Sequence, residues 1–178
     1  EIDDGNVCIV VAQDERGELV GGLNFCLRRP GMMLPTETLL EEDPRMQTFT
    51  GLRAKIARWS TRGLAESSGL WAAAGWRGTG LSVAMFRVLI AAMPSFGVRR
   101  SIAFTHQHVL KTWGPIGWRE DLEVRRIPYP DHRYQSSVIW LDPVNLDDAN
   151  EKQRDHIFHL RDVLKRGGTI RWPLKERH

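Results

Sequence analysis

The run Arg77–Ser82 is the part of the sequence best suited to chemistry, because it combines glycines, a positive charge and the start of a helix. Gly78 and Gly80 allow a sharp backbone turn and the close approach of a ligand. The amides that follow have no acceptor within the helix, and the positive end of the helix dipole adds to their attraction for anions. Arg77 places a full positive charge beside them. The run therefore predicts a site for a phosphate or pyrophosphate group.

Two common phosphate-binding motifs do not fit this run. No Gly-Lys-Ser/Thr closes it as in a Walker A loop, and the third glycine of a dinucleotide-binding fingerprint is missing. A glycine-rich helix start is also compatible with a tight turn that binds nothing. The neighbouring elements must therefore separate an anion site from a simple turn.

A helix is predicted directly after the glycines, from Thr79 or Gly80 to Met93. Apolar residues recur there with the spacing of one helix face, at Leu81, Ala84, Met85, Val88, Leu89 and Ala92. Pro94 and Gly97 end the helix. Its strong amphipathic pattern supports a well-formed N-terminus at the glycines.

A β-hairpin is predicted upstream of this helix. The apolar, β-branched runs 7–13 and 19–27 flank a polar connector at 14–18. Gly21 and Gly22 within the second run predict a bulge or a close approach of another backbone.

Downstream, residues 100–105 and 136–141 read as strands, with a short helix over 106–113 after the first. Two segments between the hairpin and the glycines are less regular. Residues 28–50 predict a long irregular connection with one short helix near 38–42, and 52–59 fits either a strand or a helix.

A last helix is predicted over 145–166. Asp147 and Asp148 suit its positive N-terminal end, and Gly167 suits its C-cap. Ile157, Leu160 and Leu164 would form its inward face.

The composition indicates one ordinary globular domain. The 178 residues carry a net charge of +3 and no apolar stretch of the roughly 20 residues that a membrane helix needs. We expect a single domain over 1–178, with a core at about 7–142 and a C-terminal helical extension at about 145–178. Two cysteines do not make a secreted disulfide framework, so Cys8 and Cys26 are expected to be free thiols in a cytoplasmic protein.

The order of motifs resembles the GNAT superfamily of acyl-CoA N-acyltransferases. Arg77 and Gly80 match the first and fourth positions of the GNAT signature Gln/Arg-x-x-Gly-x-Gly/Ala, and Ser82 replaces its last residue. In the family, the signature helix is followed by a strand, a short helix that ends in Gly-Phe, and another strand. Gly117-Trp118 stands at the place of Gly-Phe.

The resemblance implies an α/β (α+β) fold with a central, mostly antiparallel, twisted sheet that is flanked by helices and splayed near the donor site. It implies acetyl-CoA or acyl-CoA as co-substrate. The residues expected to bind it are Ala72, Ala74, Arg77, Gly78, Thr79, Gly80, Leu81 and Ser82. The first two belong to an apolar segment that would line the acyl or pantetheine slot.

The implied reaction is direct attack by an amine on an acyl thioester, carried by CoA or by an acyl carrier protein. Many family members have an Asn and a Tyr where this chain has His106 and Trp113. An indole cannot deliver a proton as a phenol can, and His106 is a candidate for acid–base work or a structural residue. Glu66 is the candidate general base, and a backbone N–H within 70–74 would polarise the thioester carbonyl.

A subfamily resemblance points to acyl-homoserine-lactone synthases. It rests on Leu34-Pro35-Thr36, Arg58-Trp59 and Gly117-Trp118. The synthase motif Glu-x-Ser-Arg-Phe is aligned with 55–59, where Lys55 stands at the position of the carboxylate.

Two other functions remain open: a GNAT-like domain that binds acyl-CoA without turnover, and a basic interaction module. The expected partners are a small-molecule amine acceptor and, as an alternative donor, an acyl carrier protein. Neither a membrane nor nucleic acid is expected, and a homodimer is compatible with the sequence. His156 and His159 have helical spacing, but no third ligand accompanies them, so no metal is expected.

Overall fold

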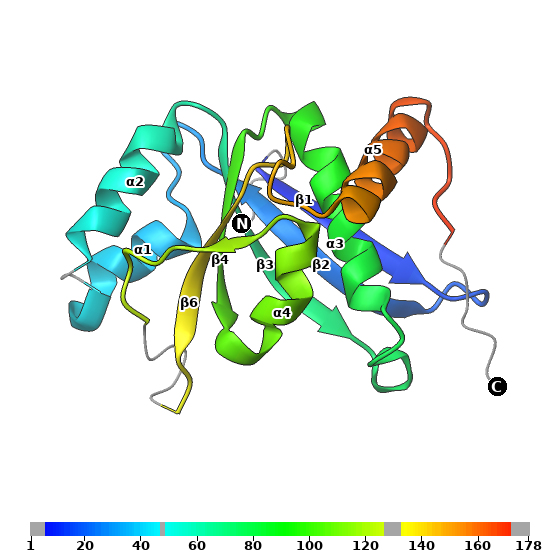
Figure 1. Ribbon diagram of the computed structural model, residues 1–178, viewed down its shortest axis with the longest axis horizontal. Helices are drawn as coiled ribbons and strands as arrows, with labels where there is room; N and C mark the ends of the chain where they lie inside the picture. Colours follow the sequence, from blue (N-terminus) through cyan, green and yellow to red (C-terminus); the bar gives the residue numbers. More distant parts are fainter. Residues whose placement is uncertain (1–5, 47–48, 127–132, 172–178) are drawn as a thin grey trace.

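The computed structural model describes residues 6–46, 49–126 and 133–171. They form a six-stranded sheet with the order β1-β2-β3-β4-β6-β5, in which only β3 and β4 run parallel. The strands are β1 Val7–Gln13, β2 Leu19–Leu27, β3 Leu64–Ala72, β4 Arg100–His106, β5 Arg119–Glu120 and β6 Ser136–Leu141. Helices flank this sheet on both faces (Figure 1). The predicted α/β architecture with a mostly antiparallel sheet is confirmed.

The predicted hairpin is formed by β1 and β2. The Asp14 carboxylate closes its turn by accepting the backbone N–H groups of Arg16 (2.9 Å) and Glu18 (3.0 Å). Cys8 and Cys26 lie one register step apart on the two strands, so their side chains point to opposite faces of the sheet. Both are free thiols, as predicted, and both are half-buried.

Gly21 and Gly22 meet both expectations for a glycine pair inside a strand. The register between β2 and β3 shifts between Gly22 and Asn24, which marks a bulge. A Cβ on Gly21 would lie 2.9 Å from Met85 Cε, and a Cβ on Gly22 would lie 2.6 Å from Trp71 Nε1. The glycines therefore let the strand bend and let two large side chains lie directly on its backbone.

Strand β3 was not predicted from the sequence. Glu66-Ser67-Ser68-Gly69 interrupts the apolar alternation that marks a strand, and Gly69 adopts φ +68 at the bulge. Pairing with β2 on one side and β4 on the other gives this segment its strand conformation.

The parallel ladder between β3 and β4 is short. It joins only Leu64–Glu66 to Arg100–Ile102. Beyond these three pairs, β3 continues along β2 and β4 continues along β6. The two central strands therefore diverge, and the sheet is splayed as the resemblance implied.

Helices α1 (Pro35–Glu42) and α2 (Thr50–Ser60) cover one face of the sheet. Their apolar side chains pack on residues of β3, β4 and β6 in one cluster that includes Leu34, Leu40, Leu52, Ile56, Leu64, Ile102 and Val138. Residues 52–59 are thus helical. The 28–50 connection is more ordered than predicted, because α1 begins at Pro35 and a 3-10 turn follows at Pro44–Met46.

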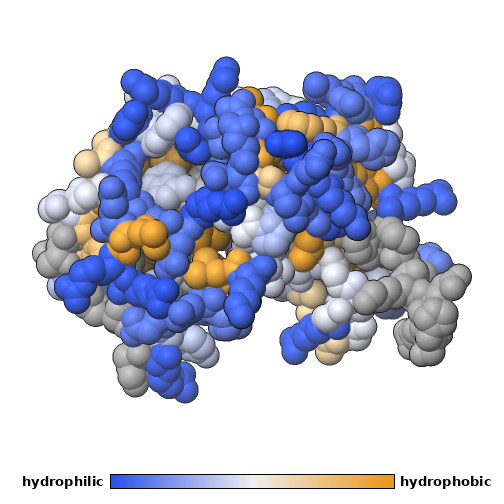
Figure 2. Space-filling model, in the orientation of Figure 1, coloured by the Kyte–Doolittle hydropathy of each residue, from blue (hydrophilic) through white to orange (hydrophobic). Residues whose placement is uncertain are grey.

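The opposite face is covered by α3 (Leu81–Ala92), α4 (Leu110–Trp113) and α5 (Glu151–Lys165). Their core includes Phe25, Ala65, Met85, Leu89, Ile90, Ala103, Ile139, Ile157 and Leu160. Figure 1 shows α3 and α5 side by side over β1 and β2. The exposed side of α5 is hydrophilic, as is most of the face in Figure 2.

The predicted start of the last helix was wrong by six residues. The Asp142 carboxylate accepts the N–H groups of Val144 and Asn145 in a turn, and Leu146 has φ +57, which no helix permits. Asn150 then caps α5 by accepting the N–H of Gln153 at 2.9 Å. Asp147 and Asp148 therefore precede the helix instead of forming its first turn, and Asp148 pairs with Arg119 at 3.3 Å.

The predicted C-terminal end of α5 is confirmed. Gly167 has φ +67, and the amides of Gly167 and Gly168 bond back to Leu164 and Val163, respectively, as in a Schellman motif. The final part of the predicted extension, 172–178, lies outside the described residues.

Gly63 directly precedes the first residue pair of β3 and β4 and bonds to the chain that enters β4. Its carbonyl accepts the N–H groups of Arg99 (2.7 Å) and Arg100 (3.1 Å). Its φ is +89, and an added Cβ would lie 2.1 Å from the Gly97 carbonyl oxygen. Gly63→Ala should lower the free energy of unfolding by about 2–4 kcal/mol in urea denaturation. Gly51→Ala, with nothing within 4 Å of the added Cβ, is the control and should change it by less than about 1 kcal/mol.

Candidate donor and acyl-transfer site

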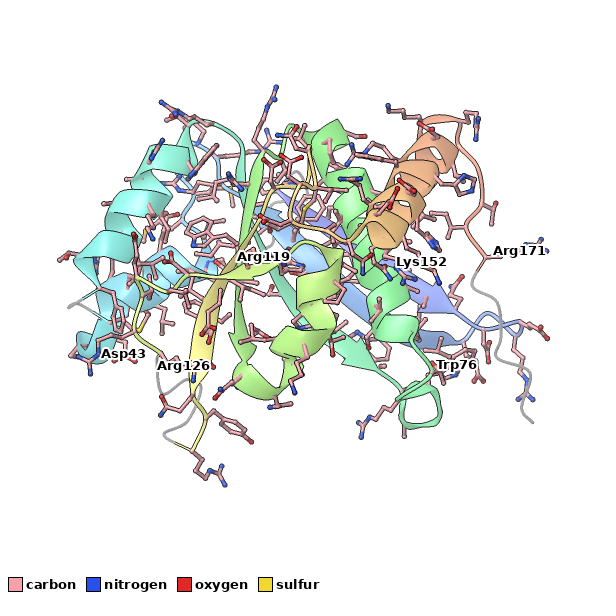
Figure 3. The ribbon with its side chains drawn as sticks, in the orientation of Figure 1. Asp43, Trp76, Arg119, Arg126, Lys152 and Arg171 are labelled. Carbon is pink, nitrogen blue, oxygen red and sulfur yellow. The ribbon has the colours of Figure 1, made fainter. Side chains whose placement is uncertain are left out.

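The predicted donor residues form one turn between the end of β3 and the start of α3. Gly78 (φ +73) and Gly80 (φ +87) both adopt left-handed backbone conformations, and Gly80 is the N-cap of α3. Thr79 Oγ1 donates to the Trp76 carbonyl at 2.7 Å, which ties the turn together. Trp76, labelled in Figure 3, lies beside this turn, and its half-buried ring packs against the core.

The first amides of α3 lie outside the hydrogen-bond ladder of the helix. The first helical hydrogen bond runs from Ala84 N to Gly80 O at 3.0 Å, so the amides of Ser82 and Val83 precede the helical ladder. Leu81 N makes only a long contact, 3.4 Å, with Thr79 Oγ1. Arg77 is exposed beside them. The turn therefore presents backbone N–H groups outside the helical ladder next to one positive charge.

The opening between the diverging strands β3 and β4 runs from this turn toward the middle of the sheet. Ala73 N donates to Val20 O of β2 at 2.9 Å. Because backbone groups alternate in direction along a strand, the N–H groups of Ala72 and Leu70 face the opposite side, toward the opening between β3 and β4. The 70–74 segment thus carries backbone N–H groups that are not paired with β2.

Glu66 occupies the last paired position before the two strands diverge, opposite Ile102. Its side chain lies on the face covered by α1 and is only 5% exposed. Its Oε2 accepts the backbone N–H of Thr36 at 2.8 Å. Burial raises the pKa of Glu66 from 4.5 to about 7, and the hydrogen bond from Thr36 offsets part of that increase. This carboxyl can therefore exchange a proton near neutral pH.

The structure does not support the alignment of the synthase motif with 55–59, which lie on helix α2. Lys55 lies on α2, where its Nζ contacts Asp121 at 2.7 Å and Glu123 at 2.6 Å. Burial alone would raise the pKa of Asp121, but hydrogen bonds from Lys55 and from Trp140 Nε1 hold it below its ordinary value. This network fastens α2 to the sheet and contains no free base.

The first and third positions of the Glu-x-Ser-Arg-Phe pattern are instead matched on β3. Glu66 and Ser68 have the Glu-x-Ser spacing, with Gly69 and Leu70 at the last two positions. The signal was in the sequence but was not recognised, because β3 itself was not predicted. Gly69, at φ +68, replaces the arginine.

His106 lies apart from Glu66. It ends β4, four residues beyond Ile102 on the same face, roughly 13 Å along the strand. Its Nδ1 is 3.2 Å from Ser136 Oγ, and its ring stacks on Tyr134 at 4.7 Å. This contact with Tyr134 was not predicted from the sequence.

Trp113 is a core residue. Its side chain is 7% exposed, and its ring lies 4.5 Å from that of Phe86 on α3. The position that holds a phenol in many GNAT enzymes therefore holds a packed indole without acid–base chemistry.

His156 and His159 lie on the exposed side of α5. Burial and the nearby charges of Arg87, His159 and Lys152 lower the pKa of His156. Within the described ranges, no group of three or more His, Cys, Asp or Glu side chains is placed to hold a metal ion. No described helix is both long and apolar enough to cross a bilayer.

Comparison of the sequence finds no matching family profile and no matching curated protein. Comparison of the structure finds similar folds. FeeM, an N-acyl amino acid synthase from uncultured soil microbes, matches with a TM-score of 0.60 and 10% identity over 81% of this chain and 77% of that chain. The chain has the GNAT fold. The CoA-dependent acyl-homoserine lactone synthase MesI matches at TM-score 0.57 and 16% identity, over 87% and 70%.

A GNAT-family N-acetyltransferase, YhbS from Escherichia coli in complex with CoA, has a similar GNAT fold. It matches with a TM-score of 0.51 and 14% identity over 83% of this chain and 66% of that chain. The fold expected from the motif order is therefore confirmed by solved structures.

The buried Glu66 makes stability depend on pH in a predictable direction. Its pKa is higher in the folded chain, so the destabilisation is absent below about 4.5 and complete above about 7. Replacement by glutamine removes this titration. The free energy of unfolding of Glu66→Gln relative to the parent should therefore rise by about 2–3 kcal/mol between pH 5 and pH 8.

Urea denaturation at several pH values measures this difference. Glu18→Gln, at an exposed position next to the hairpin turn, is the matched control for loss of one carboxylate. A difference for Glu66→Gln that stays constant across this pH range would show that Glu66 does not titrate as described.

Proposed function

We propose that the protein transfers an acyl group from acyl-CoA to a primary amine, with Glu66 as general base. The observation that carries the proposal is that a glycine-rich helix start and a buried carboxyl with a pKa of about 7 lie near opposite ends of the same strand, β3. The turn would bind the pyrophosphate of the donor, and the opening between β3 and β4 would hold its pantetheine arm. The GNAT fold of the neighbours supports acyl transfer in general.

The spacing along β3 fits this donor. From Ala72 to Ser68 the strand advances roughly 13 Å at 3.3 Å per residue. An extended pantetheine arm is about as long as five extended residues, roughly 16–18 Å. A donor whose pyrophosphate lies at Arg77–Ser82 would therefore place its thioester beside Ser68, two residues along β3 from Glu66.

Each step of the reaction can be assigned to this chain. Glu66 accepts a proton from the attacking amine, whose nitrogen then forms the bond to the thioester carbon. The backbone N–H of Leu70, which faces the opening, stabilises the negative charge on the carbonyl oxygen. The carbon–sulfur bond breaks, and the CoA thiolate takes a proton from solvent. A thiol with a pKa near 8.5 is a good leaving group, so no tyrosine is needed at position 113.

Binding to the turn is tested with glycine variants of equal backbone cost. Gly78 (φ +73) and Gly17 (φ +81) both have open space around an added Cβ. Alanine at either position should therefore destabilise the fold similarly, by roughly 1–2 kcal/mol. Only Gly78→Ala places a methyl group where the phosphates would lie, and it should weaken CoA binding at least tenfold in calorimetry.

Equal CoA affinity for Gly78→Ala and Gly17→Ala would remove the turn from the donor site. A thiol-release assay with acyl-CoA and mixed primary amines then separates an enzyme from a protein that binds CoA without turnover.

An amino-acid-type acceptor is a second, finer proposal. The Glu66-x-Ser68 match lies beneath Thr36, so the two segments that resemble the homoserine-lactone synthases meet at one place. Product analysis with SAM and with free amino acids as acceptors distinguishes a lactone-forming enzyme from a simple N-acyltransferase.

A further inference from the structure

An apolar strip crosses the sheet on the same face as Glu66. It consists of Ile9, Val11 and Trp71, whose side chains are 66%, 53% and 46% exposed. Helices α1 and α2 pack over β3, β4 and β6 on this face. In the described ranges, no helix packs over its β1–β2 part, because α3 and α5 lie on the opposite face (Figure 1).

The strand register places these side chains in order. Val11 pairs with Gly22, and Gly22 pairs with Trp71, so the three form one row across β1, β2 and β3. Side chains of paired residues on neighbouring strands point to the same face of the sheet. Along one strand, every second side chain points to that face. Ile9 therefore lies in the neighbouring row, opposite Asn24.

Gly22 makes the row continuous. Its hydrogen leaves room for the Trp71 indole, since an added Cβ would lie 2.6 Å from Nε1. The indole thus lies across β2 toward Val11 instead of standing away from the sheet. Single exposed apolar residues need no explanation, but a continuous row beside a catalytic opening does.

We propose that this strip binds the acyl chain of the donor thioester, so that the enzyme prefers medium-length acyl groups to acetyl. The inference rests on the proposed function, which places the thioester beside Ser68. From there the chain would pass the Ser68–Asn24 pair, joined by a 2.8 Å hydrogen bond, and lie along Trp71, Gly22 and Val11.

The width of the strip sets the preferred chain length. Two strand spacings from β3 to β1 amount to about 10 Å. An extended hydrocarbon of about eight carbons covers this distance, because a methylene advances about 1.3 Å, less than half the rise of a strand residue. An acyl chain that contacts the protein on one side only should gain about half the free energy of complete burial per methylene. This corresponds to about a twofold gain in affinity for each methylene.

Calorimetry with CoA, butyryl-CoA and octanoyl-CoA tests the proposal without an identified acceptor. Octanoyl-CoA should bind at least tenfold more tightly than CoA. The double variant Ile9→Thr and Val11→Thr keeps β-branched side chains at exposed strand positions and should fold normally. It should reduce the preference for octanoyl-CoA to less than threefold and leave CoA affinity unchanged.

Trp71→Ser should have the same effect on octanoyl-CoA. Leu122→Ser is the control, because Leu122 is 87% exposed outside the strip, and it should retain the full preference.

Three results would overturn the inference. One is equal affinity for CoA and octanoyl-CoA in the parent protein. Another is an octanoyl preference that persists in the double variant. The third is a parent dimer in sedimentation analysis that becomes monomeric in the double variant with its preference unchanged, since the strip would then bind a second copy. Loss of all CoA binding would instead refute the proposed function, so the two failures are distinguishable.

Discussion

The arrangement of this protein depends on the early end of the parallel ladder between β3 and β4. The two strands share only three residue pairs, from Leu64 to Glu66, and then each follows its antiparallel neighbour. At the start of this ladder, Gly63 lies so close to the Gly97 carbonyl oxygen that a side chain would not fit. After the end of the ladder, Gly69 adopts a left-handed backbone conformation where β3 turns away from β4. The antiparallel partners keep the outer edges of both strands hydrogen-bonded, so the sheet can open at its centre without losing either strand.

The opening also accounts for the chemistry assigned to Glu66. A carboxyl at the last paired position is covered by α1 and lies where β3 and β4 begin to diverge. Burial raises its pKa to about 7, and the amide of Thr36 keeps it oriented. Ionisation of a buried carboxyl in this position lowers the stability of the fold. Such a cost is common at catalytic sites, because the pKa of a general base must lie near the working pH. The donor turn lies at the far end of the same strand, so one element determines the distance between binding and reaction.

Elements with strong local patterns were predictable, and those formed by tertiary pairing were not. The β1–β2 hairpin, β4, β6 and the start of α3 followed from apolar periodicity and glycine positions. Strand β3 was missed because Glu66, Ser67 and Ser68 are polar; their strand conformation comes from neighbours on both sides. Because β3 was not predicted, the synthase motif was aligned with Lys55 instead of Glu66. The structure places Lys55 in an ion-pair network on α2. The late start of α5 came from the Asp142 turn, whose side-chain hydrogen bonds compete with a helix.

The turn at 77–82 was the most predictable part of the proposed site, since glycines directly before an amphipathic helix favour a left-handed turn there. The pKa of Glu66 could not be predicted, because it depends on burial by a helix 30 residues away. The measurement that tests the central claim most directly is mass spectrometry of products after incubation with octanoyl-CoA and mixed primary amines. The proposed chemistry predicts N-octanoyl amide and free CoA in equal amounts, and at least a hundredfold slower formation of both by Glu66→Gln. Intact thioester, or octanoic acid without amide, would contradict it.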